Sequence, residues 1–491
     1  MWFRGRTVVA MMIVTALVAG MATYAVFEYS GWALKSRDSR PGVASSDMAD
    51  GLNQAELDKI NKAVGLIEHR YIAPADRNKL IDGAVQGMVE SLNDPFSVYK
   101  SEEEAEKFSD SLQGAFTGIG ATLNVVNGFI VVEAPIRGSP AERAGLQPKD
   151  ILLSVNGDNL QGLQLNDAVA KIRGPKGTKA KLKVRREGLA EPLDLELVRD
   201  RIDLQTVSAD FGTDGVGQIT INQFTEDTSG QFADELGAMW AKGLKALVID
   251  VRDNPGGMLQ SVIEIADQLL VKDKPIVQSE YRDGKRNVDV ATHGAKNGIR
   301  VPIVVLMNKG SASAAEILAG ALKQSAGAIL IGEQTYGKGT VQASYPHELG
   351  DRSLMKLTIY KWLLPDGTWI HEKGISPDIA VEQPAYFQAS RLPRDIVMKY
   401  DTTGEAVMNL QNILAGVGFP ADRNDGYFSQ GTALALKAFQ KRESLEATGE
   451  VTAETAQRLE EALYSNLLIA GNDKQLQAAL AKARELANAS K

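Results

Sequence analysis

The stretch NKGSASAAEILAGALKQSAGAILIGEQTYGKGTVQ, residues Asn308 to Gln342, decides the fold of the largest part of this chain. It contains a helical run followed by a short apolar run, Ala328 to Ile331, and a further apolar run, Val301 to Met307, precedes it. Buried strands that alternate with helices are typical of an α/β layer. The same alternation predicts that this layer extends over Gly215 to Glu382.

Upstream, the stretch ALVIDVRDNPGGML predicts a buried strand that ends near Asp250 to Asp253 and a Pro-Gly-Gly turn before the helical run Met258 to Leu270. Glycines let a backbone amide face outward with no side chain in its way. Such an N–H can stabilise an oxyanion, so Gly256 and Gly257 are candidates. The alternative is an ordinary tight turn between strand and helix.

Two serines, Ser311 and Ser313, stand where the strand Val301 to Met307 passes into the next helix. A serine at a helix start lies near the positive end of the helix dipole, and its ordinary role there is that of an N-cap. Serine becomes a nucleophile when a base removes its proton. Lys338, flanked by two glycines, can be that base if burial lowers its pKa from about 10.4 toward 7 to 8.

Residues Phe116 to Ile202 form a different pattern of short strands and Gly-rich turns, which predicts a compact β-rich module. Within it, Ser139 and Pro140 predict the cap and the first position of a short helix that ends near Gly145. The stretch that contains them, GSPAERAGLQPKDILLSVNG (Gly138 to Gly157), resembles the PDZ family. PDZ domains hold an extended peptide at a sheet edge and its terminal carboxylate at a glycine-containing loop. The resemblance implies a ligand site formed by the following residues: Gly118, Ile119, Gly120, Ala121, Val169, Ile172 and Arg173.

Two questions about this module stay open. It could be a packing module without a ligand. Arg173, at the end of its helix Asn166 to Ile172, could sense a bound carboxylate or simply interact with the helix C-terminus.

The composition excludes several classes of protein. With 491 residues the chain is too long for one core, and several domains are expected. The net charge of −8 gives no reason to expect nucleic acid as a partner. The absence of cysteine excludes a thiol nucleophile and thiolate metal sites. The four histidines, expected to be structural, contain no H-E-x-x-H pair, so neither a metal nor another cofactor is predicted: His69, His293, His347 and His371.

The amino terminus predicts export. Arg4 and Arg6 precede Val8 to Phe27, an uncharged segment long enough to cross a bilayer. The basic flank favours a start in the cytoplasm with the rest of the chain outside. Gly20-Met21-Ala22 could be a cleavage site, so a membrane anchor and a cleaved signal, which would leave a secreted or periplasmic protein, both stay open.

The carboxyl-terminal part, Glu405 to Leu463, has apolar residues at helical spacing that predict a three-helix core, with turns at NDGYF and TGEVT. The residues expected in this core are Val407, Leu410, Leu414, Leu434 and Phe439. This part of the chain resembles the small helical peptidoglycan-binding domain of bacterial wall enzymes, which implies peptidoglycan as a partner. A helical interaction module without glycan binding is the alternative. An Ala/Lys-rich helix is expected after Asp473.

From Leu57 to Glu382 the chain closely resembles the C-terminal processing, or tail-specific, serine peptidases. Besides the stretches already quoted, LNDPFSVY, GAFTGIGA and LTIYKWLLPDGTWIHEKGISPDI carry the resemblance. It implies a nucleophile at Ser313, a base at Lys338 and a supporting Gln342, with Ser311 structural. It also implies oxyanion donors at the Ala314 amide and at one glycine of Gly256-Gly257.

These observations predict a multidomain protein of α/β and α+β class: N-terminal helices, a β-rich PDZ domain, a crotonase-like α/β core with a Ser–Lys dyad, and a small C-terminal helical domain. The expected boundaries are 1–30 for the signal or anchor, 50–113 for the N-terminal helices, 114–203 for the PDZ domain, 204–390 for the core, 402–466 for the wall-binding domain and 467–491 for the last helix.

The function that this implies is an exported endopeptidase that receives C-terminal tails of protein substrates. A catalytically weak scaffold that gathers partners through its PDZ and wall-binding domains is a second hypothesis, although a scaffold has no need of Ser313, Lys338 and Gln342 together. A hydratase of the crotonase type is a third, disfavoured because an acyl-carrier pocket signature is missing. The family resemblance, together with amphipathic spacing in Leu57 to Leu92, suggests that these helices pair two chains, with the C-terminal helix locking the dimer.

Overall fold

The computed structural model describes residues 51–489, with the exception of residues 114, 127, 137–138, 187–188, 190, 295–300, 347, 395 and 468. The expected export segment Val8 to Phe27 and His347 lie outside the described residues. Among the residues that are described, no helix is both long and apolar enough to cross a membrane. The chain divides into two compact units at Ala84 and Val85, and each is treated by itself.

The first unit contains helix α2 (Gln54–Arg70). The helix begins at Asn53, whose side chain accepts the Glu56 N–H while the Glu56 carboxylate accepts the Asn53 N–H. This reciprocal capping box explains why the helix starts there. No residue of α2 is buried, and Leu57, Leu66 and Ile67 are exposed. Helix α3 (Arg77–Glu90) follows.

A six-stranded sheet forms the core of the second unit. Its neighbouring strands are parallel except for the antiparallel edge strand β10, as expected for an α/β layer. In sheet order the strands are β10 (Val207–Phe211), β11 (Val216–Ile221), β12 (Ala246–Asp250), β15 (Ile303–Met307), β16 (Ile329–Gly332) and β19 (Ile379–Ala380). All residues of β12 and β15 are buried, which explains their apolar sequences, interrupted only by Asp250 at the end of β12.

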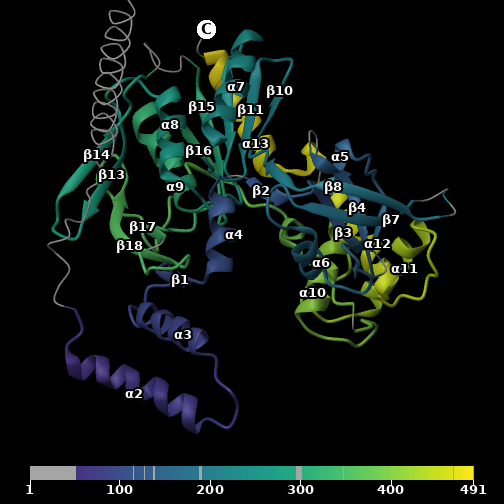
Figure 1. The fold of residues 1–491 in the computed structure, drawn as a ribbon. Coiled ribbons are helices and arrows are strands. Elements are labelled where there is room, and N and C mark those ends of the chain that lie inside the picture. Colours follow the sequence, from purple (N-terminus) through teal and green to yellow (C-terminus); the bar gives the residue numbers. More distant parts are fainter. Residues whose placement is uncertain are drawn as a thin grey trace, which may run out of the picture. The chain divides into compact units, whose positions relative to one another are not determined.

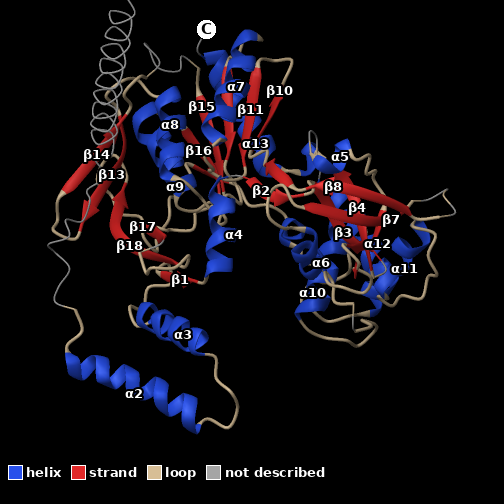
Figure 2. Ribbon diagram, viewed as in Figure 1, coloured by secondary structure: helices blue, strands red, loops and turns tan. Residues whose placement is uncertain are grey.

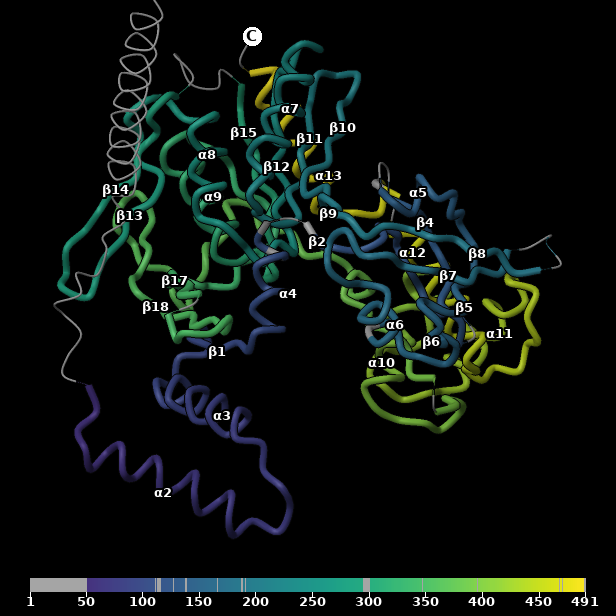
Figure 3. The backbone as a smooth tube through the Cα atoms, in the orientation of Figure 1, coloured from purple at the N-terminus to yellow at the C-terminus, as the bar shows by residue number. Residues whose placement is uncertain are grey.

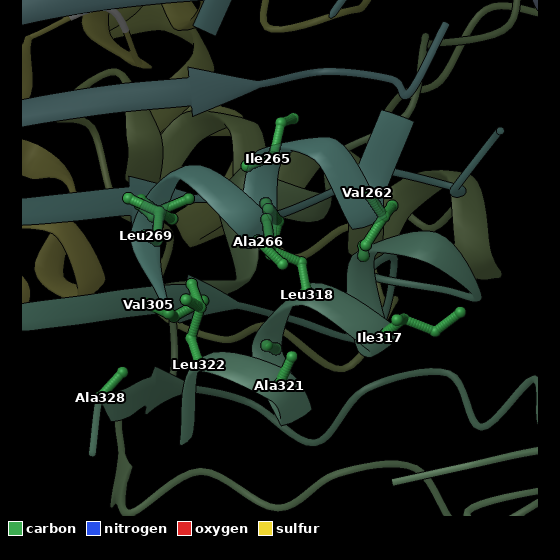
Figure 4. Close-up of a cluster of buried hydrophobic side chains, with 14 of the residues drawn as sticks. Val262, Ile265, Ala266, Leu269, Val305, Ile317, Leu318, Ala321, Leu322 and Ala328 are labelled. Atoms are coloured by element: carbon green, nitrogen blue, oxygen red, sulfur yellow. The ribbon is translucent and has the colours of Figure 1, made fainter. Parts of the chain in front are cut away.

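Alternate residues of these strands belong to two separate apolar clusters. One contains Leu247, Ile249 and Val305 together with residues of α7 (Thr228–Ala241), α8 (Leu259–Leu269) and α9 (Ala314–Ala321). Figure 4 shows side chains of α8, α9 and β15 gathered in this cluster. The π-helical turn η1 (Leu322–Ala326) continues α9.

The other face of the sheet is covered by the last helix, α13 (Lys474–Ala489). Leu476, Ala479 and Ala483 pack against Val248 and Val304, residues of the central strands β12 and β15. Figure 1 draws α13 in yellow behind the teal strands. The helix therefore uses its apolar face to complete the core of its own chain.

A second sheet lies beside this core. Strand β18 (Leu354–Leu363) pairs antiparallel with β1 (Val98–Lys100), β13 (Pro275–Tyr281) and β17 (Thr340–Pro346). The fifth strand, β14 (Arg286–Val290), pairs antiparallel with β13. A β-bulge interrupts the β17–β18 register between Val341 and Gln342. Helix α4 (Glu102–Gln113) follows β1 along the chain.

The β-rich module is a six-stranded antiparallel sheet with two helices, visible as red strands in Figure 2. Its strands are β3 (Ala121–Val126), β4 (Phe129–Pro135), β5 (Ile151–Val155), β6 (Asp158–Asn159), β7 (Lys179–Arg185) and β8 (Leu193–Val198). Its helices are α5 (Pro140–Arg143) and α6 (Leu165–Ile172). The strand before the module, β2 (Ala115–Gly118), pairs antiparallel with the strand after it, β9 (Asp200–Asp203). The Ser139 hydroxyl accepts the Glu142 N–H and Pro140 opens α5, as the sequence predicted.

Three helices with one apolar core form the domain before α13: α10 (Glu405–Gly416), α11 (Gln430–Arg442) and α12 (Ala453–Leu467). Val407, Leu410, Leu414 and Phe439 are fully buried in it, whereas Leu434, also expected there, is 67% exposed. Short 3-10 turns, η2 (Ala385–Gln388) and η3 (Ala470–Asn472), flank the domain. Figure 3 lets the chain be followed from β18 through these helices to α13.

Candidate functional site

The two serines that follow β15 have different surroundings. Ser311 is fully buried, donates its hydroxyl hydrogen to the Val251 carbonyl over 2.7 Å and accepts the Asn308 N–H over 3.0 Å. Ser313 is half-buried at the start of α9 with a φ of 53°. A positive φ is unusual for a residue other than glycine and marks local strain, which often occurs at functional sites. Ser311 is therefore a structural residue, and Ser313 is the candidate nucleophile.

Lys338 follows β16 and lies half-buried between Gly337 and Gly339, both buried. Its ammonium nitrogen is 4.8 Å from the centre of the Phe96 ring. The pKa of Lys338 is lowered to about 8, mainly by burial and also by the charge of Lys356, while the carboxylates of Asp94 and Glu316 act against this. A lysine with that pKa is partly neutral near pH 8, which a general base requires.

Glu316 connects the serine loop with the lysine loop, a role that the sequence analysis did not assign. It is fully buried. Its Oε2 accepts the N–H groups of Ser313 (2.8 Å) and Lys338 (2.9 Å). Its Oε1 accepts the hydroxyl of Thr335 (2.6 Å) and the N–H of Gly337 (2.8 Å). The only signal in the sequence was a Glu three residues after the Ser, the spacing of a capping box.

The glycine turn after β12 lies against Ser313. A Cβ atom on Gly256 would be 3.0 Å from Ser313 Cβ and 3.1 Å from the Ala314 nitrogen. A Cβ on Gly257 would be 1.9 Å from the Phe224 carbonyl oxygen, and φ is 143° there. Both positions therefore require glycine.

The amide groups of this turn differ in their partners. The Gly256 N–H donates to Asn254 Oδ1 over 2.8 Å, and the Asn254 side chain in turn donates to the Ile221 carbonyl. Within the described part of the chain, the N–H groups of Gly257 and Ala314 have no hydrogen-bond acceptor. Ala314 is the first residue of α9, where the helix itself supplies no acceptor.

Several hydrogen bonds join the glycine turn to the serine loop. Asn308 and Asp253 exchange two, each of 2.9 Å. The Ala312 N–H donates to the Asn254 carbonyl over 3.0 Å. The two loops follow adjacent parallel strands, β12 and β15, at whose carboxyl ends ligands bind in open α/β sheets. The loops therefore form one rigid surface.

Gln342 has partners other than the lysine. Its amide donates to the hydroxyl groups of Thr340 (3.1 Å) and Thr358 (3.0 Å). Among the described residues, no hydrogen bond joins Gln342 to Lys338, and none joins Ser313 Oγ to Lys338 Nζ. Catalytic hydrogen bonds are often loose before substrate binds and tighten in the complex.

A cleft of about 890 Å³ opens beside the lysine loop. Its wall includes Asn93 to Phe96, which belong to the LNDPFSVY motif, and residues of β13 and β18. His371 also lines it, accepts the Gly339 N–H over 3.2 Å and stacks on Trp369 with ring centres 5.1 Å apart. These contacts are those of the structural histidine that the sequence predicted.

A second pocket, of about 140 Å³, lies in the β-rich module. All seven residues expected to bind a peptide line it, together with three others: Phe116, Leu123 and Leu165. The pocket adjoins β3, which is an edge strand of its sheet. The Arg173 guanidinium lies 5.0 Å from the centre of the Phe116 ring. The described residues contain no group of His, Asp or Glu that could hold a metal ion.

Family models match four parts of the chain. Peptidase family S41 matches residues 215–381, the PDZ domain 131–186, the activating protease CtpB N-terminal domain 16–104 and a peptidoglycan binding domain 403–459.

Relatives match over most of their length. The carboxy-terminal processing protease CtpB of Bacillus subtilis is 44% identical over 443 residues, which are 89% of this chain and 91% of that protein. CtpA of the same organism is 39% identical over 95% of this chain and 96% of its own. Among solved structures, the photosystem II D1 C-terminal processing protease is 24% identical over 67% of this chain and 94% of its own, with a TM-score of 0.41.

Proposed function

This chain belongs to peptidase family S41 and is a C-terminal processing serine peptidase with a PDZ domain, and we propose that Ser313 is its nucleophile and Lys338 its general base. The observation that carries the assignment is the buried Glu316, which accepts backbone N–H groups from both residues. The pKa of about 8 for Lys338 and the strained backbone of Ser313 fit these roles.

The reaction is an acyl transfer. Neutral Lys338 takes the hydroxyl proton of Ser313, whose oxygen attacks the peptide carbonyl. The ammonium of Lys338 then protonates the leaving amine, and water hydrolyses the acyl-enzyme. Before proton transfer the Lys338 side chain has to turn from the Phe96 ring toward Ser313, because no hydrogen bond joins the two side chains among the described residues. We assign Gln342 the role of orienting the lysine in that arrangement.

The oxyanion forms where two amides are free to donate. Of the two glycines, Gly257 is the better candidate because the Gly256 N–H is already bound to Asn254. The second donor is the N–H of Ala314, at the positive end of α9. Gly256 contributes by its missing side chain, since a Cβ there would press on Ser313 and Ala314.

The pocket of the PDZ domain is proposed to receive substrate tails. An extended peptide would pair with the edge strand β3 and place its last apolar side chain between Val169 and Ile172. Its terminal carboxylate would meet the amides of Gly118 to Ala121, close to Arg173.

Three further assignments follow from the sequence. Val8 to Phe27 is proposed as a membrane anchor, or alternatively a cleaved signal, that leaves the catalytic part outside the cytoplasm. Residues 402–466 are proposed to bind peptidoglycan, for which their family match is the support. The exposed apolar residues of α2, among them Leu57, Leu66 and Ile67, support a homodimer formed through the N-terminal helices.

The test is cleavage of an unfolded reporter protein by the full-length chain and by Ser313→Ala and Lys338→Ala. Both variants should lose at least about 10³-fold in activity, as removal of a member of a catalytic unit does elsewhere. Lys309→Ala is the control, because Lys309 is on the serine loop with its side chain 77% exposed. An inert parent, even with added tail peptides, would favour the scaffold hypothesis instead.

A further inference from the structure

The chain leaves the core before the helical domain and returns to the core after it at the same place. Gln383 precedes the domain and Asp473 follows it, 90 residues later, yet the Gln383 side chain donates to the Asp473 carboxylate. The Lys474 N–H donates back to Gln383 Oε1 over 3.2 Å. Gln475 donates to the Val381 carbonyl over 2.8 Å. We call Gln383, Asp473, Lys474 and Gln475 the stem of the helical domain.

The stem is bound to Arg252. The guanidinium pairs with both oxygens of Asp473, at 2.9 and 2.8 Å, and donates to Gln475 Oε1 over 3.2 Å. Its other side pairs with Asp250 at 2.6 and 2.9 Å. The three charged side chains are only 15% (Arg252), 6% (Asp250) and 12% (Asp473) exposed. Buried pairs of this kind have one defined geometry, and breaking them is costly.

Arg252 lies between β12 and the glycine turn, four residues before Gly256. Other hydrogen bonds of this turn are made with the serine loop and with the Ile221 carbonyl. Phe224 also holds it, because its N–H donates to the Gly256 carbonyl over 3.0 Å and its carbonyl accepts the Met258 N–H over 2.8 Å. The ion pair of Arg252 with Asp473 thus connects this turn with the carboxyl-terminal part of the chain, 221 residues away. A turn that is held on both sides keeps its free amide in one orientation. A shift of about 1 Å in such a group can lower the rate about 10²-fold.

We propose that Arg252 and Asp473 are positioning residues for the oxyanion turn, so that the stem of the helical domain sets the rate of the chemical step. The inference rests on the proposed role of the Gly257 amide. It makes the helical domain, with both its ends at the stem, part of the apparatus that orients the active site. The alternative is that the pair only stabilises the fold.

Asp473→Asn in the full-length chain separates these two roles. Asp473 also caps α13 by accepting the Leu476 N–H through Oδ1, and asparagine keeps that function, so the variant loses the charge of the pair and the second oxygen that accepts Arg252. We expect kcat for a peptide substrate to fall about 10- to 100-fold with KM within about twofold of the parent. Binding of a peptide boronic acid, which forms a tetrahedral adduct with serine, should weaken by the same factor as kcat.

The control is Arg484→Gln, which removes another ion pair of α13, with Asp214 before β11. It should leave kcat, KM and boronate binding within about twofold of the parent, since this pair does not touch the glycine turn. If Asp473→Asn melts below the assay temperature, Arg252→Lys, which keeps the charge and loses the bidentate geometry, takes its place with the same expectation.

An unchanged kcat in a folded Asp473→Asn protein, or a change confined to KM, would overturn the inference. An equal loss of kcat in Arg484→Gln would also do so, because it would show a general effect of loosening α13. These outcomes differ from a failure of the proposed function, which would appear as activity that survives Ser313→Ala.

Discussion

The proposed catalytic site and the proposed tail-binding pocket differ in how they are built. The catalytic site joins loops from two adjacent parallel strands through a buried carboxylate, Glu316, that takes four hydrogen bonds. The tail pocket is an apolar hollow between the edge strand β3 and helix α6. Its one charged side chain, Arg173, stacks on Phe116.

The difference follows from what each place has to do. Acyl transfer needs a nucleophile, a base and two amides fixed relative to one another, because small displacements are costly. A tail pocket needs a free strand edge, whose backbone groups bind any sequence, and one apolar hollow for the last side chain. Substitutions in the catalytic site should therefore abolish the chemistry. Substitutions in the tail pocket should change which chains are cut and how tightly they bind.

The largest effect is expected for Lys338→Met. Methionine keeps much of the side chain's volume but cannot accept a proton, so cleavage of a short peptide without a recognised tail should fall at least about 10³-fold. Tail-peptide affinity should stay unchanged, measured by fluorescence anisotropy. A residual rate above about 10% of the parent would contradict the role of Lys338 as base.

Glu316→Gln should have the next largest effect. Glutamine offers one oxygen where the carboxylate has two, so two of four buried donors lose their acceptor, at about 1–3 kcal/mol each. We expect a lower melting temperature, and about 10²-fold lower kcat in the protein that remains folded, because both loops lose a fixed position. Glu264→Gln, on exposed α8 surface, is the matched control. An active, equally stable Glu316→Gln enzyme would show that the bridge is dispensable.

Val169→Asp should give a smaller and different effect. Val169 lines the tail pocket and is half-buried, so a carboxylate there would repel the end of a bound tail. Tail-peptide affinity should fall about 10- to 100-fold, the cost of about 1–3 kcal/mol in an apolar pocket. Cleavage of a tailless peptide should be unaffected. Equal loss of both activities would show that tail binding in the pocket and cleavage in the catalytic site are not independent.

Lys356→Gln should give the smallest effect, a shift of the pH profile. In the proposed mechanism the neutral form of Lys338 is the active one, so kcat/KM should rise with pH around the pKa of Lys338, about 8. The positive charge of Lys356 lowers that pKa. Its removal should therefore move the midpoint of the profile to higher pH, while tail binding keeps its pH dependence. A midpoint displaced to lower pH would contradict the assigned cause.

The sequence predicted most of this architecture because its signals are local. The fully buried strands β12 and β15 have apolar sequences, interrupted only by Asp250 at the end of β12, and the Ser139-Pro140 cap identifies the start of a helix directly. The candidate residues of the tail pocket all line one hollow.

Other features depend on contacts that spacing does not reveal. Asn254 occupies the Gly256 amide and so distinguishes two adjacent glycines that look equivalent in sequence. Glu316 looks like an ordinary first-turn acid until the lysine loop, about 20 residues later, is placed on its carboxylate. The last helix was expected to lock two chains, yet the face with Ala479 and Ala483 is covered by its own sheet.

The most direct test of the central claim is the rate at which a fluorophosphonate labels the full-length chain between pH 6 and 10, with the modified residue located by mass spectrometry. We expect the label on Ser313 and a labelling rate that rises with pH, with a midpoint near pH 8. Labelling of Lys338→Met should be at least about 10³-fold slower. A label on another residue, or an unchanged rate in Lys338→Met, would contradict the central claim.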